Sequence, residues 1–130
     1  MRFLLLLLIL IPGAYAESGH MTLLTVDDEG ERGGVADVFL RVQEGTGVVF
    51  IDSFPLSRLD AQRSTRYANR IACAFLDMDC TNLAFFYTIR SGGQTVGGPS
   101  AGGAIAVLTV AVLDGGKVRE EVAMTGTINS

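Results

Sequence analysis

The strongest constraint on the fold comes from residues 101–113, an almost unbroken run of small and apolar side chains. A helix that is apolar around its whole circumference has no face for water and is normally buried. The sequence Asp114-Gly115-Gly116 follows the run and favours a helix end there. The chain has 130 residues, 48% of them hydrophobic, which suits one small domain packed around this helix.

The segments around this helix alternate between strand-like and helical patterns. A hairpin is expected from residues 35–42 and 48–52, because Glu44-Gly45-Thr46-Gly47 between them favours a turn. Residues 27–34 are acidic and rich in glycine and are expected to form a loop. Further strands are expected at residues 21–26, 83–89 and 122–128. The resulting order predicts an α/β fold with a mixed sheet.

A long helix is expected from Ser57 to Met78, where Ser57 and Asp60 fit a capping box. Mostly apolar residues recur along this helix at spacings of three and four, which predicts that they form one buried face: Ala61, Thr65, Ala68, Ala72 and Phe75. A basic stripe follows the same spacing: Arg63, Arg66 and Arg70. This stripe is either a solvated helix face or a surface for an acidic partner or peptide.

Residues 1–16 have the features of a signal peptide. Arg2 precedes the apolar run 3–11, Pro12-Gly13 interrupts it, and Ala14-Tyr15-Ala16 fits a small-x-small cleavage site. We therefore expect residues 17–130 to form the mature domain outside the cytoplasm. That domain would be secreted, or tethered to a membrane if the leader stays uncleaved. A buried N-terminal strand or helix is the alternative.

Charge and cysteine content narrow the classes of partner. The net charge of −4 offers no basic surface for nucleic acid. Cys73 and Cys80 would lie about 10 Å apart on one continuous helix, which is too far for a disulfide. If the helix ends near Met78, the two can pair, so a disulfide and two buried thiols both remain open. Neither cysteine has a neighbouring histidine, so no metal site is expected, and His20 is expected to be exposed.

Chemistry is expected at Ser100, within Gly97-Gly98-Pro99-Ser100-Ala101-Gly102-Gly103. The glycines permit a tight turn and a close backbone approach, and Pro99 fixes φ before the serine. Ser100 would stand at the N-terminus of the buried helix, where free amides and the helix dipole favour an alkoxide or an oxyanion. A structural N-cap serine would give the same pattern. Neither the phosphate-binding P-loop motif nor G-x-S-x-G is present.

Several segments, in order, resemble the proteolytic domain of the Lon (S16) proteases, especially archaeal Lon-like sequences. The matching segments are Asp52-Ser53-Phe54-Pro55-Leu56, Ala68-Asn69-Arg70-Ile71-Ala72, Phe85-Phe86-Tyr87-Thr88-Ile89-Arg90, Gly98-Pro99-Ser100-Ala101-Gly102 and Val122-Ala123-Met124-Thr125-Gly126-Thr127-Ile128-Asn129. The serine motif followed by Ala-Met-Thr-Gly is the most specific part. The resemblance covers essentially all of residues 17–130 and implies a Lon-like α/β fold.

The resemblance implies a serine endopeptidase that acts on peptides or unfolded proteins. Ser100 would attack the peptide carbonyl, and a lysine whose pKa is lowered by burial would act as the general base. Backbone groups of the turn at Gly98, Pro99 and Ala101 would hold the oxyanion. Thr125 matches the threonine of the family motif and would orient the lysine. A ring-shaped homo-oligomer is also implied. No cofactor is expected, because there is no Walker motif to support ATP dependence.

The sequence departs from the family pattern in two places. The family lysine is expected about forty residues after Ser100, whereas the only lysine here is Lys117, in a turn that is variable in the family. We therefore expect a C-terminally truncated domain that is inactive by itself. Gly97 replaces an acidic residue that many relatives carry. The alternative interpretation is a non-catalytic Lon-like module that binds peptides by strand addition, or one that serves assembly.

Overall fold

The computed structural model describes residues 15–27, 29–93 and 97–129. Within these ranges the chain forms one mixed sheet and two helices, so the predicted α/β fold is confirmed. The elements in chain order are β1 (Ala16–Val26), β2 (Gly33–Glu44), β3 (Val49–Phe54), α1 (Leu59–Phe75), β4 (Leu83–Ser91), α2 (Gly102–Leu113) and β5 (Ala123–Met124).

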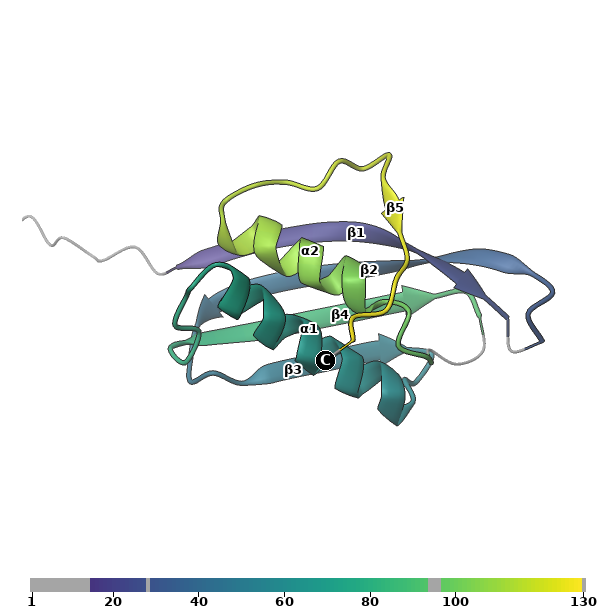
Figure 1. Cartoon of the computed structure of the whole chain (residues 1–130), viewed down its shortest axis with the longest axis horizontal. Coiled ribbons are helices and arrows are strands. Elements are labelled where there is room, and N and C mark those ends of the chain that lie inside the picture. The colour runs from purple at the N-terminus through teal and green to yellow at the C-terminus, as the bar shows by residue number, and fades with distance from the viewer. Residues whose placement is uncertain (1–14, 28, 94–96, 130) are drawn as a thin grey trace, which may run out of the picture.

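The strands are ordered β3-β4-β2-β1-β5 across the sheet. β1 pairs antiparallel with β2, and β2 pairs antiparallel with β4. β3 pairs parallel with β4, and β5 pairs parallel with β1. Parallel neighbours need a crossover connection, and α1 provides it between β3 and β4. The sheet therefore brings the first and the last strand of the described chain side by side (Figure 1).

The predicted hairpin between residues 35–42 and 48–52 is wrong, because β4 lies between β2 and β3. The turn at residues 45–47 bonds to the start of β4 instead. The Gly45 amide donates to the Asn82 carbonyl at 2.9 Å, and the Gly47 amide donates to the Leu83 carbonyl at 2.8 Å. A Cβ atom on Gly45 would stand 2.4 Å from the Ala84 Cβ, so the glycine allows β4 to approach. The hairpin is formed by β1 and β2.

Both helices cover the same face of the sheet (Figure 1). Alternate residues of β2 point toward the helices and are almost fully buried, as expected for a half-covered sheet. The core of this layer combines them with residues of the neighbouring strands and of α2: Met21, Leu23, Ala36, Val38, Leu40, Val42, Phe85, Ile89, Ile105, Leu108 and Val112.

The predicted helix after Ser57 is present but shorter, as Leu59–Phe75. Its N-cap is Arg58, which makes no side-chain capping hydrogen bond, so the predicted capping box at Ser57 is wrong. Four of the five residues predicted for its buried face are buried. Phe75 is instead 76% exposed, because the face continues to Leu76, which packs against the core.

The prediction of a buried helix at residues 101–113 is confirmed by α2, which has eight buried residues. A hydrogen-bonded chain of polar groups joins it to α1 and to β4. The Asn69 side-chain amide donates to the Tyr87 hydroxyl at 3.1 Å, and that hydroxyl lies 2.7 Å from the Thr109 hydroxyl. Thr109 in turn donates to the Ile105 carbonyl at 2.7 Å. This arrangement gives each of the three buried polar side chains a hydrogen-bond partner.

Cys73 and Cys80 form a disulfide, with their Cα atoms 6.3 Å apart. The pairing is possible because α1 ends at Phe75 and the chain reverses at Asp77, which has a φ of 50°. The spacing left open a disulfide or two buried thiols, and the structure has the disulfide.

Most of the predicted signal peptide, residues 1–14, lies outside the described residues. Ala16, the residue before the predicted cleavage point, is the first residue of β1 and pairs with Gln43. Residues predicted to form a strand at 122–128 do so only at Ala123–Met124. In the part of the chain that the structure describes, neither helix has the length and apolar character needed to cross a membrane.

Candidate functional site

Ser100 lies in the connection between β4 and α2, just before the N-cap residue Ala101. We call residues 97–101 the serine loop. Ser100 is exposed, and among the described residues its hydroxyl has no hydrogen-bond partner. The position at the start of a buried helix is therefore as predicted, and the serine hydroxyl is open to a ligand.

Two side chains of α1 hold the serine loop. The Asp60 carboxylate accepts a hydrogen bond from the Gly98 amide at 3.0 Å, and the Ser64 hydroxyl donates to the Pro99 carbonyl at 3.1 Å. Gly98 has a φ of 80°, a conformation that side chains rarely adopt, so this position favours glycine. The loop is therefore fixed against the first two turns of α1, just ahead of Ser100.

The segment after β5 holds the other side of the loop (Figure 1). The Gly126 amide donates to the Ser100 carbonyl at 2.7 Å, and the Gly103 amide donates to the Gly126 carbonyl at 2.8 Å. The Thr125 hydroxyl also reaches the Ser100 carbonyl, at 3.4 Å. The two parts of the sequence that carry the serine motif and the Ala-Met-Thr-Gly motif thus meet in space.

Two glycines allow this close packing around the start of α2. A Cβ atom on Gly102 would stand 2.6 Å from the Ser64 hydroxyl, and one on Gly103 would stand 3.0 Å from the Gly126 carbonyl oxygen. Contacts shorter than van der Waals separation would push the serine loop away from α1 or from the C-terminal segment. Gly102 and Gly103 therefore let the Ser64 side chain and the backbone of Gly126 approach the start of α2.

The three residues predicted to hold an oxyanion differ in whether their backbone amide is free to donate a hydrogen bond. The Gly98 amide is bonded to Asp60, and Pro99 has no amide hydrogen. The Ala101 amide donates to no atom within the described residues, and it follows Ser100 directly. Of the three, Ala101 is thus the residue whose amide hydrogen is not already bonded among the described residues.

The single lysine and the single histidine of the sequence both lie away from Ser100. Lys117 is exposed and follows the C-terminal end of α2. The helix between them is 12 residues long, which separates its two ends by about 18 Å at 1.5 Å per residue. His20 lies on the sheet face opposite the helices, where its Nε2 is 2.8 Å from the Asp37 carboxylate. Among the described residues, no lysine or histidine reaches the serine hydroxyl.

A groove runs along the first two turns of α1 beside the serine loop. It is lined by Arg58, Leu59, Asp60, Arg63, Ser64, Tyr67, Pro99 and Ile128. We call it the α1 groove. It shares Asp60, Ser64 and Pro99 with the contacts that hold the serine loop, so a ligand in it would lie next to Ser100.

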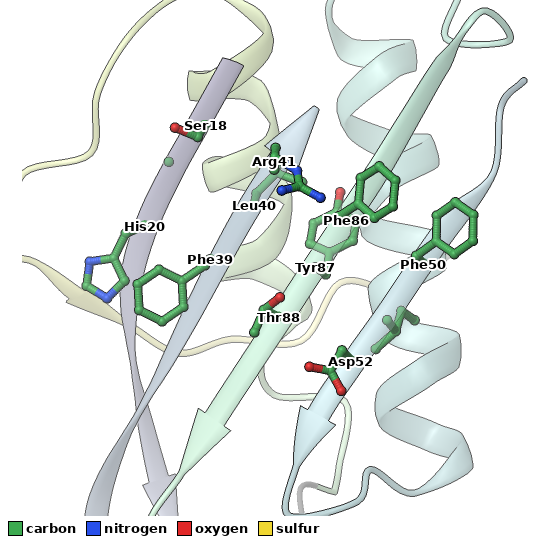
Figure 2. Close-up of a pocket in the computed structure, with 12 residues that line it drawn as sticks. Ser18, His20, Phe39, Leu40, Arg41, Phe50, Asp52, Phe86, Tyr87 and Thr88 are labelled. Carbon is green, nitrogen blue, oxygen red and sulfur yellow. The ribbon is translucent and has the colours of Figure 1, made fainter. Parts of the chain in front are cut away.

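A second hollow lies on the sheet face away from the helices, shown in Figure 2. Phe50 and Phe86 stack there with ring centroids 4.7 Å apart, and the Arg41 guanidinium lies 4.9 Å from the centre of the Phe86 ring. His20 stacks on Phe39 in the same hollow at 4.6 Å. The residues around Ser100 line the α1 groove on the opposite side of the sheet, so the two hollows are separate.

The sequence did not indicate the side chains that position the serine loop. In the sequence, Asp60 fits a helix capping box and Ser64 belongs to no motif. The only signal was their spacing of four, which places both on one side of α1. Their contacts with Gly98 and Pro99 span more than thirty residues of sequence, so they depend on the tertiary arrangement.

Residues 77–130 match the family model of the Lon protease (S16) C-terminal proteolytic domain. This range contains β4, the serine loop, α2 and the segment around Thr125, so the match supports a protease domain of the S16 family. No curated protein matches the chain. Among solved structures, the chain is similar to L. major mevalonate kinase in complex with R-mevalonate, with a TM-score of 0.34 and 12% identity. That alignment covers 78% of this chain but 36% of the kinase chain, so this chain spans about a third of that protein.

Proposed function

We propose that Ser100 is the nucleophile of a Lon-type serine endopeptidase site that uses a lysine as its general base. The observation that carries the proposal is the meeting of the serine loop with Thr125 and Gly126. Both residues bind the Ser100 carbonyl, while the Ser100 hydroxyl stays exposed. The match of residues 77–130 to the S16 family covers all of these groups.

The proposed reaction starts with attack of the Ser100 hydroxyl oxygen on the carbonyl carbon of a peptide bond. The hydroxyl proton passes to the neutral amine of the lysine, and the carbonyl oxygen becomes an oxyanion. The Ala101 amide and the positive end of α2 favour that charge. When the C–N bond breaks, the lysine returns the proton to the leaving amine. Water then hydrolyses the acyl-serine ester and regenerates the hydroxyl.

We place the lysine base outside the 130 residues. Lys117 is the only lysine in the sequence, and it lies beyond the far end of α2 from Ser100. In this proposal Thr125 acts as a positioning residue, because its hydroxyl already lies beside the Ser100 backbone. The substrates would be peptides or unfolded proteins, encountered outside the cytoplasm if residues 1–16 act as a signal peptide.

The test uses protein produced from the full reading frame in which these residues stand. A fluorophosphonate probe should label Ser100, and a fluorogenic peptide should be hydrolysed. Ser100→Ala should abolish both signals. Ser18→Ala is the matched control, because Ser18 is another exposed serine and lies on the other sheet face. Labelling that persists in Ser100→Ala, or a reading frame without a second lysine, would contradict the proposal.

A second candidate function is peptide binding without catalysis, by addition of a strand to the sheet. The observation that favours it is the position of β3 at the edge of the sheet. An extended peptide could pair with the outer edge of such a strand beyond Val49, whose carbonyl already accepts a hydrogen bond from Arg66. This function predicts that peptides bind while the probe leaves Ser100 unlabelled.

A further inference from the structure

The α1 groove has more positive than negative charge. Arg58 and Arg63 line it together with one carboxylate, that of Asp60. Both oxygens of that carboxylate already accept hydrogen bonds, from the Ala61 amide at 2.8 Å and from the Gly98 amide at 3.0 Å. The Asp60 charge is thus held toward the backbone of α1 and the serine loop, and the groove offers a net positive charge to a ligand.

Arg63 is the groove residue whose charge is most open to a ligand. It is exposed in the second turn of α1, and within the described residues its guanidinium makes no hydrogen bond or ion pair. Arg66, on the next position of the same stripe, differs because it donates to the Val49 carbonyl at 2.8 Å. An unpaired guanidinium has five donors in a plane that matches a carboxylate.

Arg58 extends the positive charge to the serine loop itself. A Cβ atom on Gly97 would stand 2.2 Å from Arg58 Nε and 2.4 Å from Nη2, so the guanidinium occupies the space that a side chain at 97 would need. The absence of a side chain at Gly97 therefore lets a cation lie close to the backbone that leads to Ser100.

The remaining walls suit the carbon atoms of a short acidic side chain. Leu59 is 60% exposed and lines the groove, and Tyr67 adds a partly buried aromatic ring. The methylene groups of glutamate can contact these apolar surfaces while its carboxylate meets a guanidinium. A lysine or arginine side chain would be repelled by Arg58 and Arg63 at the same place.

We propose that the α1 groove selects an acidic side chain, aspartate or glutamate, in the extended peptide whose carbonyl is presented to Ser100. Arg63 is the main ion-pairing residue, and Arg58 adds positive potential beside the loop. This inference rests on the proposed function, because it takes the ligand to be a peptide substrate. Within the basic stripe of α1, Arg63 then binds the ligand, Arg66 donates to the Val49 carbonyl, and the Arg70 guanidinium lies 5.8 Å from the centre of the Tyr67 ring.

Binding of two matched peptides tests the inference. One peptide is rich in glutamate near its centre, and the other has glutamine at the same positions. Fluorescence anisotropy with the Ser100→Ala protein measures binding without cleavage. An ion pair at an open surface is modest, so the glutamate peptide should bind about three- to fivefold more tightly. In salt of about 1 M, where the screening length is about 3 Å, the difference should disappear.

Variants of Arg63 and a matched control locate the effect. Arg63→Gln should remove the preference for glutamate, and Arg63→Lys should keep most of it, because the charge remains. Arg32→Gln is the control, because it removes the same charge from the β1–β2 connection, outside the groove. Equal binding of the two peptides, no binding of either, or an equal effect of Arg32→Gln and Arg63→Gln would overturn the inference.

Failure of this inference can be told apart from failure of the proposed function. If Ser100 is labelled by the fluorophosphonate but the peptides bind equally, only the acidic preference is wrong. If the glutamate preference depends on Arg63 but Ser100 remains unlabelled, the groove binds acidic peptides and the peptidase proposal is wrong.

Discussion

The Asp60 carboxylate accepts a hydrogen bond from the amide of Gly98, 38 residues further along the chain, at 3.0 Å. This contact joins the first turn of α1 to the serine loop, two residues before Ser100. It uses the same carboxylate that the sequence pattern assigned to a capping box. An acidic side chain thus helps to fix the backbone of the candidate nucleophile without contacting the nucleophile itself.

Asp60→Ala is expected to loosen the serine loop and leave the rest of the fold intact. A hydrogen bond of this kind contributes about 1 kcal/mol, so protection of the Gly98 amide from hydrogen exchange should fall about fivefold. Protection of amides in β2 should stay the same. Glu120→Ala removes an acidic side chain from an exposed turn and should leave Gly98 unchanged. Unaltered protection in Asp60→Ala would show that the contact does not hold the loop.

The hydroxyl of Tyr87 is expected to be needed for stability, because it is the acceptor for Asn69 and lies beside Thr109 in the core. Tyr87→Phe leaves the buried Asn69 amide without this acceptor. An unsatisfied buried polar group costs about 1–3 kcal/mol, and the unfolding free energy in urea should fall by that amount. Tyr67→Phe is the matched control, since Tyr67 is only partly buried and its hydroxyl bonds to none of the described residues. A similar loss in both variants would argue against the polar chain.

Stability is expected to fall at alkaline pH because of the same tyrosine. Burial raises the pKa of Tyr87 from 10.0 to about 12, and its hydrogen bonds with Thr109 and Asn69 act in the opposite direction. Between these values an unfolded tyrosine loses its proton while the folded one keeps it. The unfolded state then binds fewer protons, so the unfolding free energy decreases as the pH rises through this window. Urea titrations should show a steeper decrease in the wild type than in Tyr87→Phe, and parallel slopes would contradict the assignment.

Reduction of the Cys73–Cys80 disulfide is expected to destabilise the end of α1. For a loop with a sequence separation of 7, the chain-entropy model gives a loss of about 2.4 kcal/mol. The urea midpoint should therefore fall when a reductant is added. The double variant Cys73→Ala, Cys80→Ala should have a lowered midpoint that no longer responds to reductant. An equal response of the wild type and the double variant to reductant would show that the disulfide does not cause the shift.

The sequence predicted where helices and strands lie along the chain better than it predicted which strands pair in the sheet. Helix α2 was recognisable because an apolar run of that length must be buried. The pairing of β2 was missed because Gly45 and Gly47 are typical of a tight hairpin, whereas here they permit the approach of β4. Local patterns report the conformation of a segment, and a strand inserted from elsewhere in the chain leaves no local mark.

For the candidate site, the sequence likewise predicted the local loop but not the contacts that hold it. Ser100 stood out because glycines and a proline surround it, and the structure brings its loop beside Thr125. The anchoring by Asp60 and Ser64 was not predictable, since each has an ordinary role on a solvated helix turn. The buried pairing of Asn69 with Tyr87 was equally hidden, although a polar residue beside the apolar face of a helix usually has a buried hydrogen-bond partner.

The Gly126 amide, which holds the Ser100 carbonyl, belongs to a segment that is synthesised after the serine. β5, which leads into that segment, pairs with β1, the first strand of the described chain. During translation, α2 and its glycines therefore leave the ribosome before the partner that fixes their N-terminal end exists. Contacts between such distant parts of the chain form late in folding. The hydrogen bond that fixes the Ser100 backbone can thus form only after Gly126 has emerged, so the candidate nucleophile acquires its final setting well after its own synthesis.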